Sequence, residues 1–283
     1  MARNQSTIWK KLSLLGIVLA GLWLLWPRPE AIVSSLASPA ASSVIPKQLK
    51  PEIAHSRRES SVLLAAYLHA KNSAKKEQLL NALAQTQDRS ITGRLIELLA
   101  VETDEAAADT MQWMLVRMAD ATMLRQIVER YESVPGAAEA KRLTTLVQRI
   151  RSDELAGLLV SLVDAPIAME DMLTKAALVA LREIGSPFVA DALARRLNSA
   201  ITEADQAYLE AALAGICRPG TQHSLIAIAT DQKAINQSAT RVAAIQALSN
   251  FHDPETRDAL SLLAQSKAPE IAAAAQKVIG QKR

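Results

Sequence analysis

Apolar residues recur at helical spacing from Ser60 almost to the end of the chain, and short stretches with Pro, Gly, Asp or Ser interrupt them. The pattern also repeats over a longer distance, because the last strong apolar residue of each Ala- and Leu-rich segment returns after 31 to 35 residues. These residues are Leu83, Met118, Ile150, Leu181, Ile216, Leu248 and Ile279. In six of the segments a second apolar residue lies three positions before the spaced residue, so both are on the same face of the helix. This second set is Leu80, Leu115, Val147, Leu178, Leu213 and Ile245.

A second helix follows these segments, as in "SPFVADALARRLNS" and "DPETRDALSLLAQS". Ser186 and Asp253 can cap these helices, and Pro187 and Pro254 suit a first helical turn. Neither helix of a pair can bury its apolar stripe alone, so neighbouring pairs must stack and share one core. The spacing predicts an all-α chain with six helical hairpins and a final partial unit at 269–279.

The segments "TKAALVALREIGSPFVADALARRLNS" and "TRVAAIQALSNFHDPETRDALSLLAQSKAPEIAAAAQKVIG" resemble HEAT repeats, in which an Ala-rich helix and an apolar-Gly turn precede an Asp-Pro or Ser-Pro start. The resemblance is good over 174–280 and weaker over 77–164. Tetratricopeptide repeats have a similar period of about 34 residues, but their Trp, Gly, Tyr and Pro pattern is absent. The resemblance implies an armadillo-type α-solenoid.

In HEAT-like stacks the second helices resemble an inner, concave lining, which makes their polar residues candidates for contact with a partner. A solvated helix face is the alternative interpretation of the same residues. The candidate partner-binding residues are Arg125, Glu129, Arg195, Arg196 and Arg257.

The N-terminal segment carries a membrane-insertion signal, an uncharged apolar run from Leu12 to Trp26 that follows Arg3, Lys10 and Lys11. Small residues suited to signal-peptide cleavage come only some ten residues later, in "SLASPAASS", so an uncleaved anchor is favoured over a cleaved signal. The positive-inside rule places the N-terminus in the cytoplasm and the rest of the chain in the periplasm of a bacterium. We therefore expect a cytoplasmic tip and single-pass inner-membrane anchor at 1–29, an Ala/Ser/Pro-rich tether at 30–58 and the repeat domain at 59–283.

The net charge of +3 is unevenly distributed along the chain. Residues 1–58 hold eight Lys or Arg and two Glu, which leaves 24 basic and 27 acidic residues, a net charge of −3, in 59–283. The repeat domain thus lacks the positive excess expected for binding a phosphate backbone. Nucleic acid is excluded as an expected partner.

No catalytic or ligand-binding motif stands out in the chain. The four His residues are scattered, and GxSxG, P-loop, GxGxxG and HExxH patterns are absent, so no metal, cofactor or catalytic residue is expected. Cys217 is expected to be buried, and acidic pairs such as Asp104 with Glu105 are expected to cap helices. Helical spacing favours core packing for Met111, Met114, Met118 and Trp113, with an adaptable binding surface as the alternative.

Together these features predict a membrane-anchored protein-binding scaffold or adaptor, without enzymatic activity, that holds a cell-envelope or secreted protein. One alternative is a periplasmic chaperone or foldase, because the layout resembles lipase-specific foldases, although their aromatic-rich motif is not evident. Another is a structural subunit of a secretion or pilus-like assembly. Some HEAT-like proteins, including bilin lyases and a DNA glycosylase family, are enzymes, and the expected export and the acidic repeat domain count against both activities.

Overall fold

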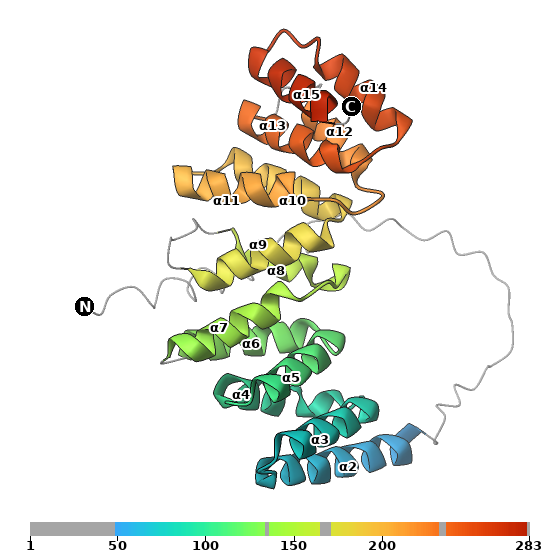
Figure 1. Cartoon of the computed structure of the whole chain (residues 1–283), viewed down its shortest axis with the longest axis vertical. Coiled ribbons are helices and arrows are strands. Elements are labelled where there is room, and N and C mark those ends of the chain that lie inside the picture. The colour runs from blue at the N-terminus through green and yellow to red at the C-terminus, as the bar shows by residue number, and fades with distance from the viewer. Residues whose placement is uncertain (1–48, 134–135, 165–170, 232–235, 282–283) are drawn as a thin grey trace, which may run out of the picture. The chain divides into compact units, whose positions relative to one another are not determined.

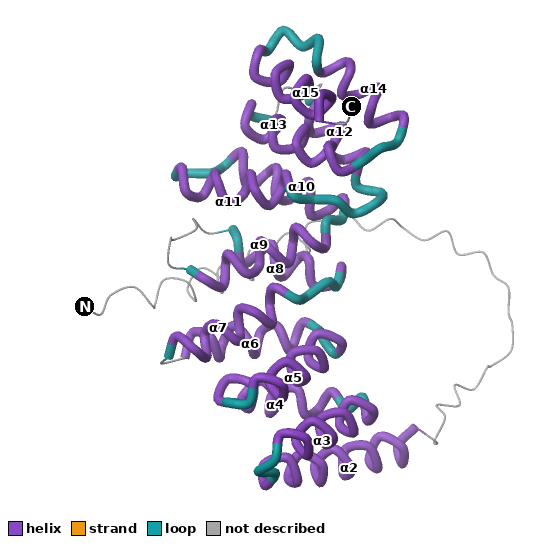
Figure 2. Tube along the Cα trace, in the orientation of Figure 1, coloured by secondary structure: helices purple, strands orange, loops and turns teal. Residues whose placement is uncertain are grey.

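The computed structural model describes residues 49–133, 136–164, 171–231 and 236–281, which lie in the larger of two compact units, Gln48–Arg283. These residues form α-helices, three short 3-10 turns and loops, without a strand (Figure 2). The predicted anchor, Leu12 to Trp26, lies outside the described residues. Among the helices that are described, none combines the length and the apolar character needed to cross a membrane.

The helices form two series that alternate along the chain (Figure 1). The odd-numbered helices are α3 (Ser73–Thr86), α5 (Glu105–Arg117), α7 (Ala137–Gln148), α9 (Met172–Ile184), α11 (Glu203–Ala214), α13 (Ser238–Ala247) and α15 (Pro269–Gln281). The even-numbered helices are α2 (Leu49–His69), α4 (Thr92–Val101), α6 (Ala121–Ser133), α8 (Ala156–Leu162), α10 (Pro187–Asn198), α12 (Gln222–Thr230) and α14 (Pro254–Leu263). The 3-10 turns are η1 (Arg89–Ile91), η2 (Asp153–Leu155) and η3 (Leu248–Asn250).

Packing is strongest between helices that are close in the chain. Each odd-numbered helix packs on the next odd-numbered one, from α3 to α15, and α8, α10, α12 and α14 pack in the same order. Each even-numbered helix also contacts the odd-numbered helix that follows it. The described part of the chain is therefore a helical-repeat-like, all-α structure, in which neighbouring units share one core.

The long-range spacing of apolar residues marks this core, as predicted. All seven spaced residues lie in odd-numbered helices or within two residues of their C-terminal ends. Met118 and Ile279 are partly buried against the core, and the other five are buried. Their six partners three positions earlier are also buried. The helix α2, in contrast, begins at Leu49 and so occupies the end of the range 30–58 that the sequence assigned to a tether.

Local capping explains several helix boundaries. Asp253 accepts a hydrogen bond from the N–H of Thr256 at 2.9 Å, and Asp104 accepts from Ala106 and Ala107, so both predicted caps are confirmed. Ser186 has the extended backbone of a cap, but its side chain makes no capping hydrogen bond. Pro187 supplies the preset φ of the first turn there instead.

Gly185 ends α9 in the left-handed region, with φ of 52°. A Cβ at this position would lie 3.1 Å from the carbonyl oxygen of Arg182 and 3.2 Å from Cβ of Arg218. We expect Gly185→Ala to lower the free energy of unfolding by about 1 to 2 kcal/mol, because a side chain is strained in this conformation. Gly157→Ala, in α8 with open space around its Cβ, is the matched control and should leave stability unchanged or slightly raised, as urea unfolding would measure.

Two residues that the sequence assigned to the core lie at the surface. Cys217 is exposed, because it follows the end of α11 and is outside the periodic pattern of that helix. Trp113 is 50% exposed, because Met111, Met114 and Leu115 already fill the buried face of α5. The prediction of core packing is confirmed for Met111 and Met114 and is wrong for Trp113 and Cys217.

Candidate functional site

The candidate partner-binding residues are distributed over three even-numbered helices. Arg125 and Glu129 are exposed and four positions apart on α6, Arg195 is exposed on α10, and Arg257 is exposed on α14. Within the described residues none of these four side chains forms an ion pair. Arg195 lines a hollow in the described surface, so we build the candidate site around it.

Arg195 lines a surface hollow of about 830 Å³ between α10 and α12. Asp191 lies one turn before Arg195 on α10 and lines the same hollow. His223 and Thr230 contribute from α12, and Asp231 follows the C-terminal end of that helix. We call this surface the Arg195 hollow.

The Arg195 hollow combines positive and negative groups with apolar side chains. Arg195 and Asp191 are both exposed and form no ion pair with any residue in the described part of the chain. His223 Nδ1 lies 3.3 Å from Glu255 Oε2, which connects the hollow to α14. Ile226 provides an apolar contact in the wall of the hollow. Such a surface can pair charges of either sign on a partner while burying some apolar area.

Arg196 has a different environment from its neighbour, and its assignment to a partner-binding surface is wrong. Its side chain is buried, with Nη2 at 2.9 and 2.7 Å from the two carboxylate oxygens of Asp205 and Nε at 2.8 Å from the carbonyl oxygen of Val163. Successive residues of a helix point about 100° apart, and on α10 this rotation places Arg195 at the surface and Arg196 on the buried face with Val189 and Leu193. Arg196 joins α10 to α11 and to the end of α8.

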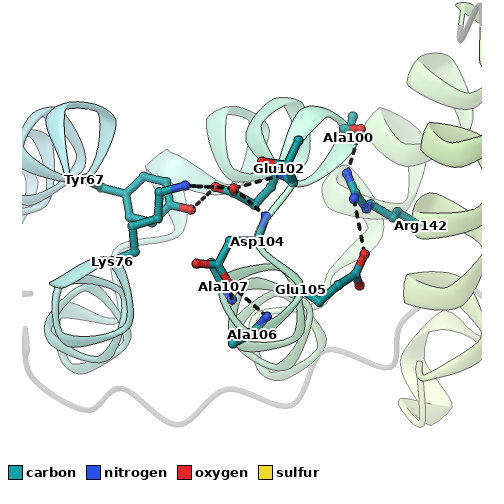
Figure 3. Close-up of polar contacts among 10 residues, drawn as sticks. Tyr67, Lys76, Ala100, Glu102, Asp104, Glu105, Ala106, Ala107 and Arg142 are labelled. Carbon is teal, nitrogen blue, oxygen red and sulfur yellow. Dashed lines mark hydrogen bonds and ion pairs between the residues drawn. The ribbon is translucent and has the colours of Figure 1, made fainter. Parts of the chain in front are cut away.

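The sequence analysis did not identify a cluster formed by the buried Tyr67 and Glu102 with the partly buried Lys76 (Figure 3). The Glu102 carboxylate follows α4, accepts two hydrogen bonds from Lys76 Nζ at 2.8 and 2.9 Å, and accepts another from the Tyr67 hydroxyl. The N–H groups of Thr103 and Asp104 donate to it at 2.9 Å each. These contacts connect α2, α3 and the start of α5.

These hydrogen bonds and the burial of the cluster change the pKa values of the Glu102 carboxylate and the Tyr67 hydroxyl. Burial raises the pKa of Glu102, but the hydrogen bonds from Lys76, Tyr67 and the Asp104 N–H, with the charge of Lys76, outweigh it and lower this pKa to about 2. Burial and the neighbouring carboxylate raise the pKa of the Tyr67 hydroxyl well above its usual range. Perturbed groups often mark active sites. Here the carboxylate is buried and fully hydrogen-bonded, which indicates a structural role.

Potential metal ligands do not gather in the described ranges. No three His, Cys, Asp or Glu side chains there come close enough together to hold a metal ion.

Comparison with known proteins adds little to this geometry. No family model matches the chain, and no curated protein sequence matches it. Among the solved structures that resemble it is that of human deoxyhypusine hydroxylase in complex with glycerol, with a TM-score of 0.34 and 15% identity, over 82% of this chain and 97% of that chain.

This neighbour corrects one expectation from the sequence. We expected a chain without enzymatic activity, and that expectation is contradicted, because the neighbour is by its name an enzyme. At this identity and TM-score the likeness assigns no activity to the present chain.

Proposed function

We propose that the chain is a membrane-anchored scaffold or adaptor whose helical repeats form a HEAT-like α-solenoid and hold a cell-envelope or secreted protein. The N-terminal apolar run would anchor it in the inner membrane, with the repeats in the periplasm. The observation that carries the proposal is the Arg195 hollow, in which an exposed arginine and an exposed aspartate are left without ion-pair partners among the described residues.

The neighbourhood of the hollow supports a protein as the partner. Phe188 at the start of α10 is 51% exposed and Leu262 on α14 is 66% exposed, so apolar surface lies on the same helices as the charged groups. Protein interfaces combine a few apolar anchors and arginines with a polar rim. The overall acidic excess of 59–283 argues against nucleic acid on this surface.

The HEAT-like architecture is supported by the packing and by the corner between α9 and α10. Odd-numbered helices pack in series, and the Ile184-Gly185-Ser186-Pro187 corner joins an Ala-rich helix to one that begins with proline. Such stacks offer extended surfaces on which a partner is held without a deep pocket.

The proposal predicts that Arg195→Ala weakens capture of the partner without affecting the fold. Full-length protein, crosslinked in native membranes and purified, should enrich an envelope or secreted protein, and the substitution should reduce that enrichment about tenfold, as expected for an arginine at an interface centre. Arg94→Ala is the matched control, because Arg94 is an exposed arginine on α4. Quantitative mass spectrometry gives the enrichment.

Thermal unfolding of both variants should match that of the unchanged protein, because both side chains are exposed. If the unchanged protein enriches no protein over empty resin after crosslinking, the scaffold function is refuted. Equal enrichment by the Arg195→Ala and Arg94→Ala variants would instead remove the Arg195 hollow from the interface.

A further inference from the structure

A second hollowed surface is lined by residues of α3 and α5. These two helices differ from those of the Arg195 hollow, α10 and α12, and all four are labelled in Figure 1. It consists of two adjoining hollows of about 560 and 320 Å³, which share Asn81 of α3 and Trp113 of α5. The buried Met114 and the partly buried Ala84 also line the larger hollow. We call this surface the Trp113 groove.

Trp113 is the central feature of the groove, since it lines both hollows. Its ring is half exposed, and the guanidinium of Arg117, one turn further along α5, lies 4.6 Å from the ring centroid. This contact orients both side chains at the surface. Trp113 lies outside the packed core, and Arg117 fixes the orientation of its ring. An indole of this kind is a typical anchor for an apolar side chain of a partner.

Three side-chain amides surround the tryptophan in the larger hollow. Asn81 and Gln85 are one turn apart on α3, and Gln87 follows the end of that helix. All three side chains are exposed and, within the part of the chain that the structure describes, make no hydrogen bond. An amide can donate and accept at once, which matches the N–H and C=O groups that an extended peptide presents along its length.

The charges in the groove favour an acidic ligand at one end. Arg89 and Arg117 both line the larger hollow, whereas Asp109 lines the smaller one. Arg89 has only a loose, exposed contact with Asp120 at 3.8 Å, and Arg117 forms no ion pair within the described residues. A carboxylate of a ligand in the larger hollow could therefore pair with both guanidinium groups, because few acidic side chains of the protein itself occupy them.

We propose that the Trp113 groove binds an extended, acidic peptide segment of a protein. An apolar side chain of the segment packs on Trp113, its backbone pairs with the amides of Asn81 and Gln85, and a carboxylate next to the apolar residue pairs with Arg89 and Arg117. The inference goes beyond the proposed scaffold function, because it assigns a separate site and a ligand class, and it does not depend on the Arg195 hollow.

Other ligands that stack on tryptophan fit less well. A neutral sugar would leave the two arginines of the larger hollow without a charge partner. Nucleic acid would bring several phosphates toward a region that also contains Asp109 and Asp120. A short anionic stretch within a peptide satisfies the arginines, the amides and the indole together.

The test uses full-length protein in detergent micelles, immobilised and exposed to an equimolar mixture of capped peptides about eight residues long, with every side chain represented at each position. Retained peptides are identified by mass spectrometry. We expect them to contain Asp or Glu beside a large apolar residue, and to be retained about tenfold less by Trp113→Ala. Arg117→Gln should weaken the preference for acidic residues, because it leaves only Arg89 to pair with the carboxylate.

Two matched variants control for loss of the fold and for nonspecific peptide binding. Ile201→Ala removes an exposed apolar side chain from the segment between α10 and α11, and Arg94→Gln removes an exposed guanidinium from α4. Both should retain the same peptides as the unchanged protein, and thermal unfolding should be the same for all four variants. The Arg195→Ala variant should also retain these peptides. The peptide-binding proposal can therefore be refuted without refuting the scaffold function, and the reverse also holds.

A second measurement reports directly on the indole. Replacing Trp9, Trp23 and Trp26 by Phe leaves Trp113 as the only tryptophan of the chain, so a retained peptide should shift its fluorescence emission in a saturable way. Equal retention by the unchanged protein and Trp113→Ala, or retained peptides without an excess of Asp and Glu, would overturn the proposal. Retention of a neutral oligosaccharide or a single-stranded oligonucleotide, in preference to peptides, would also overturn it.

Discussion

Arg196→Ala is expected to lower the free energy of unfolding by about 3 to 5 kcal/mol, the largest effect of any single substitution proposed for this protein. Arg196 and Asp205 are 8% and 0% exposed, and the guanidinium also holds the carbonyl oxygen of Val163. Removing it would leave a carboxylate and a backbone oxygen without this partner in the interior. The cost comes mainly from that buried charge, and only partly from the lost attraction.

The free energy of unfolding is measured by titrating the full-length protein in detergent with urea. Circular dichroism monitors the loss of helix. The neighbouring substitution Arg195→Ala is a close control, since it removes the same group from the exposed side of the same helix and should change stability by less than about 0.5 kcal/mol. Replacing both partners, Arg196→Met with Asp205→Leu, should recover much of the loss. Equal stability of the Arg195→Ala and Arg196→Ala variants would show that Arg196 does not stabilise the packing of α10 on α11 through a buried ion pair with Asp205.

Glu102→Gln is expected to lower the free energy of unfolding by about 3 kcal/mol at neutral pH. The carboxylate is the common acceptor for Tyr67, Lys76 and two backbone N–H groups, and a neutral amide cannot pair with the Lys76 ammonium or accept all of these bonds. The difference between the folded pKa of about 2 and the ordinary value of 4.5 corresponds to a similar free energy, about 3 kcal/mol.

The same shift predicts how stability depends on pH. Because folding lowers the pKa of Glu102, its contribution is fully present above about pH 4.5 and is lost as the pH falls toward 2. The unfolding free energy of the unchanged protein should therefore decline over this interval more than that of Glu102→Gln. The control is Glu97→Gln, from an exposed pair with Arg94 on α4, which should follow the unchanged protein. Parallel curves for Glu102→Gln and the unchanged protein would contradict the assignment.

The helical repeat could be predicted from the chain because its causes are local. A residue such as Leu181 and its partner Leu178 share a helix face whatever surrounds them, and a run of such pairs needs neighbours to cover it. Gly185 and the Asp253-Pro254 pair act through the backbone within one turn of themselves. These features are visible without knowledge of the packing.

The candidate site could be predicted only in part. Arg195 was identified and lines a hollow, but the sequence treated Arg196 as its equivalent. A signal was present, because Arg196 follows the buried Val189 and Leu193 by seven and three positions and so falls on the apolar face of α10. An arginine at such a position needs hydrogen-bond acceptors in the interior. That these are Asp205 and the carbonyl oxygen of Val163 depends on how α8 and α11 pack against α10.

By itself, the sequence determined that the described part of this protein is all-α, where its helices repeat and which periodic apolar residues form its core, because spacing and capping act over a few residues. Only the tertiary structure decided that Trp113 lies in a groove with α3, that Arg195 lines a hollow with α12, and that Glu102 and Asp205 are buried acceptors. The physical reason is that each of these environments is assembled from more than one helix, and the spacing of residues along a single helix does not determine how the helices pack. A charge or a ring acquires its role from the groups that surround it there.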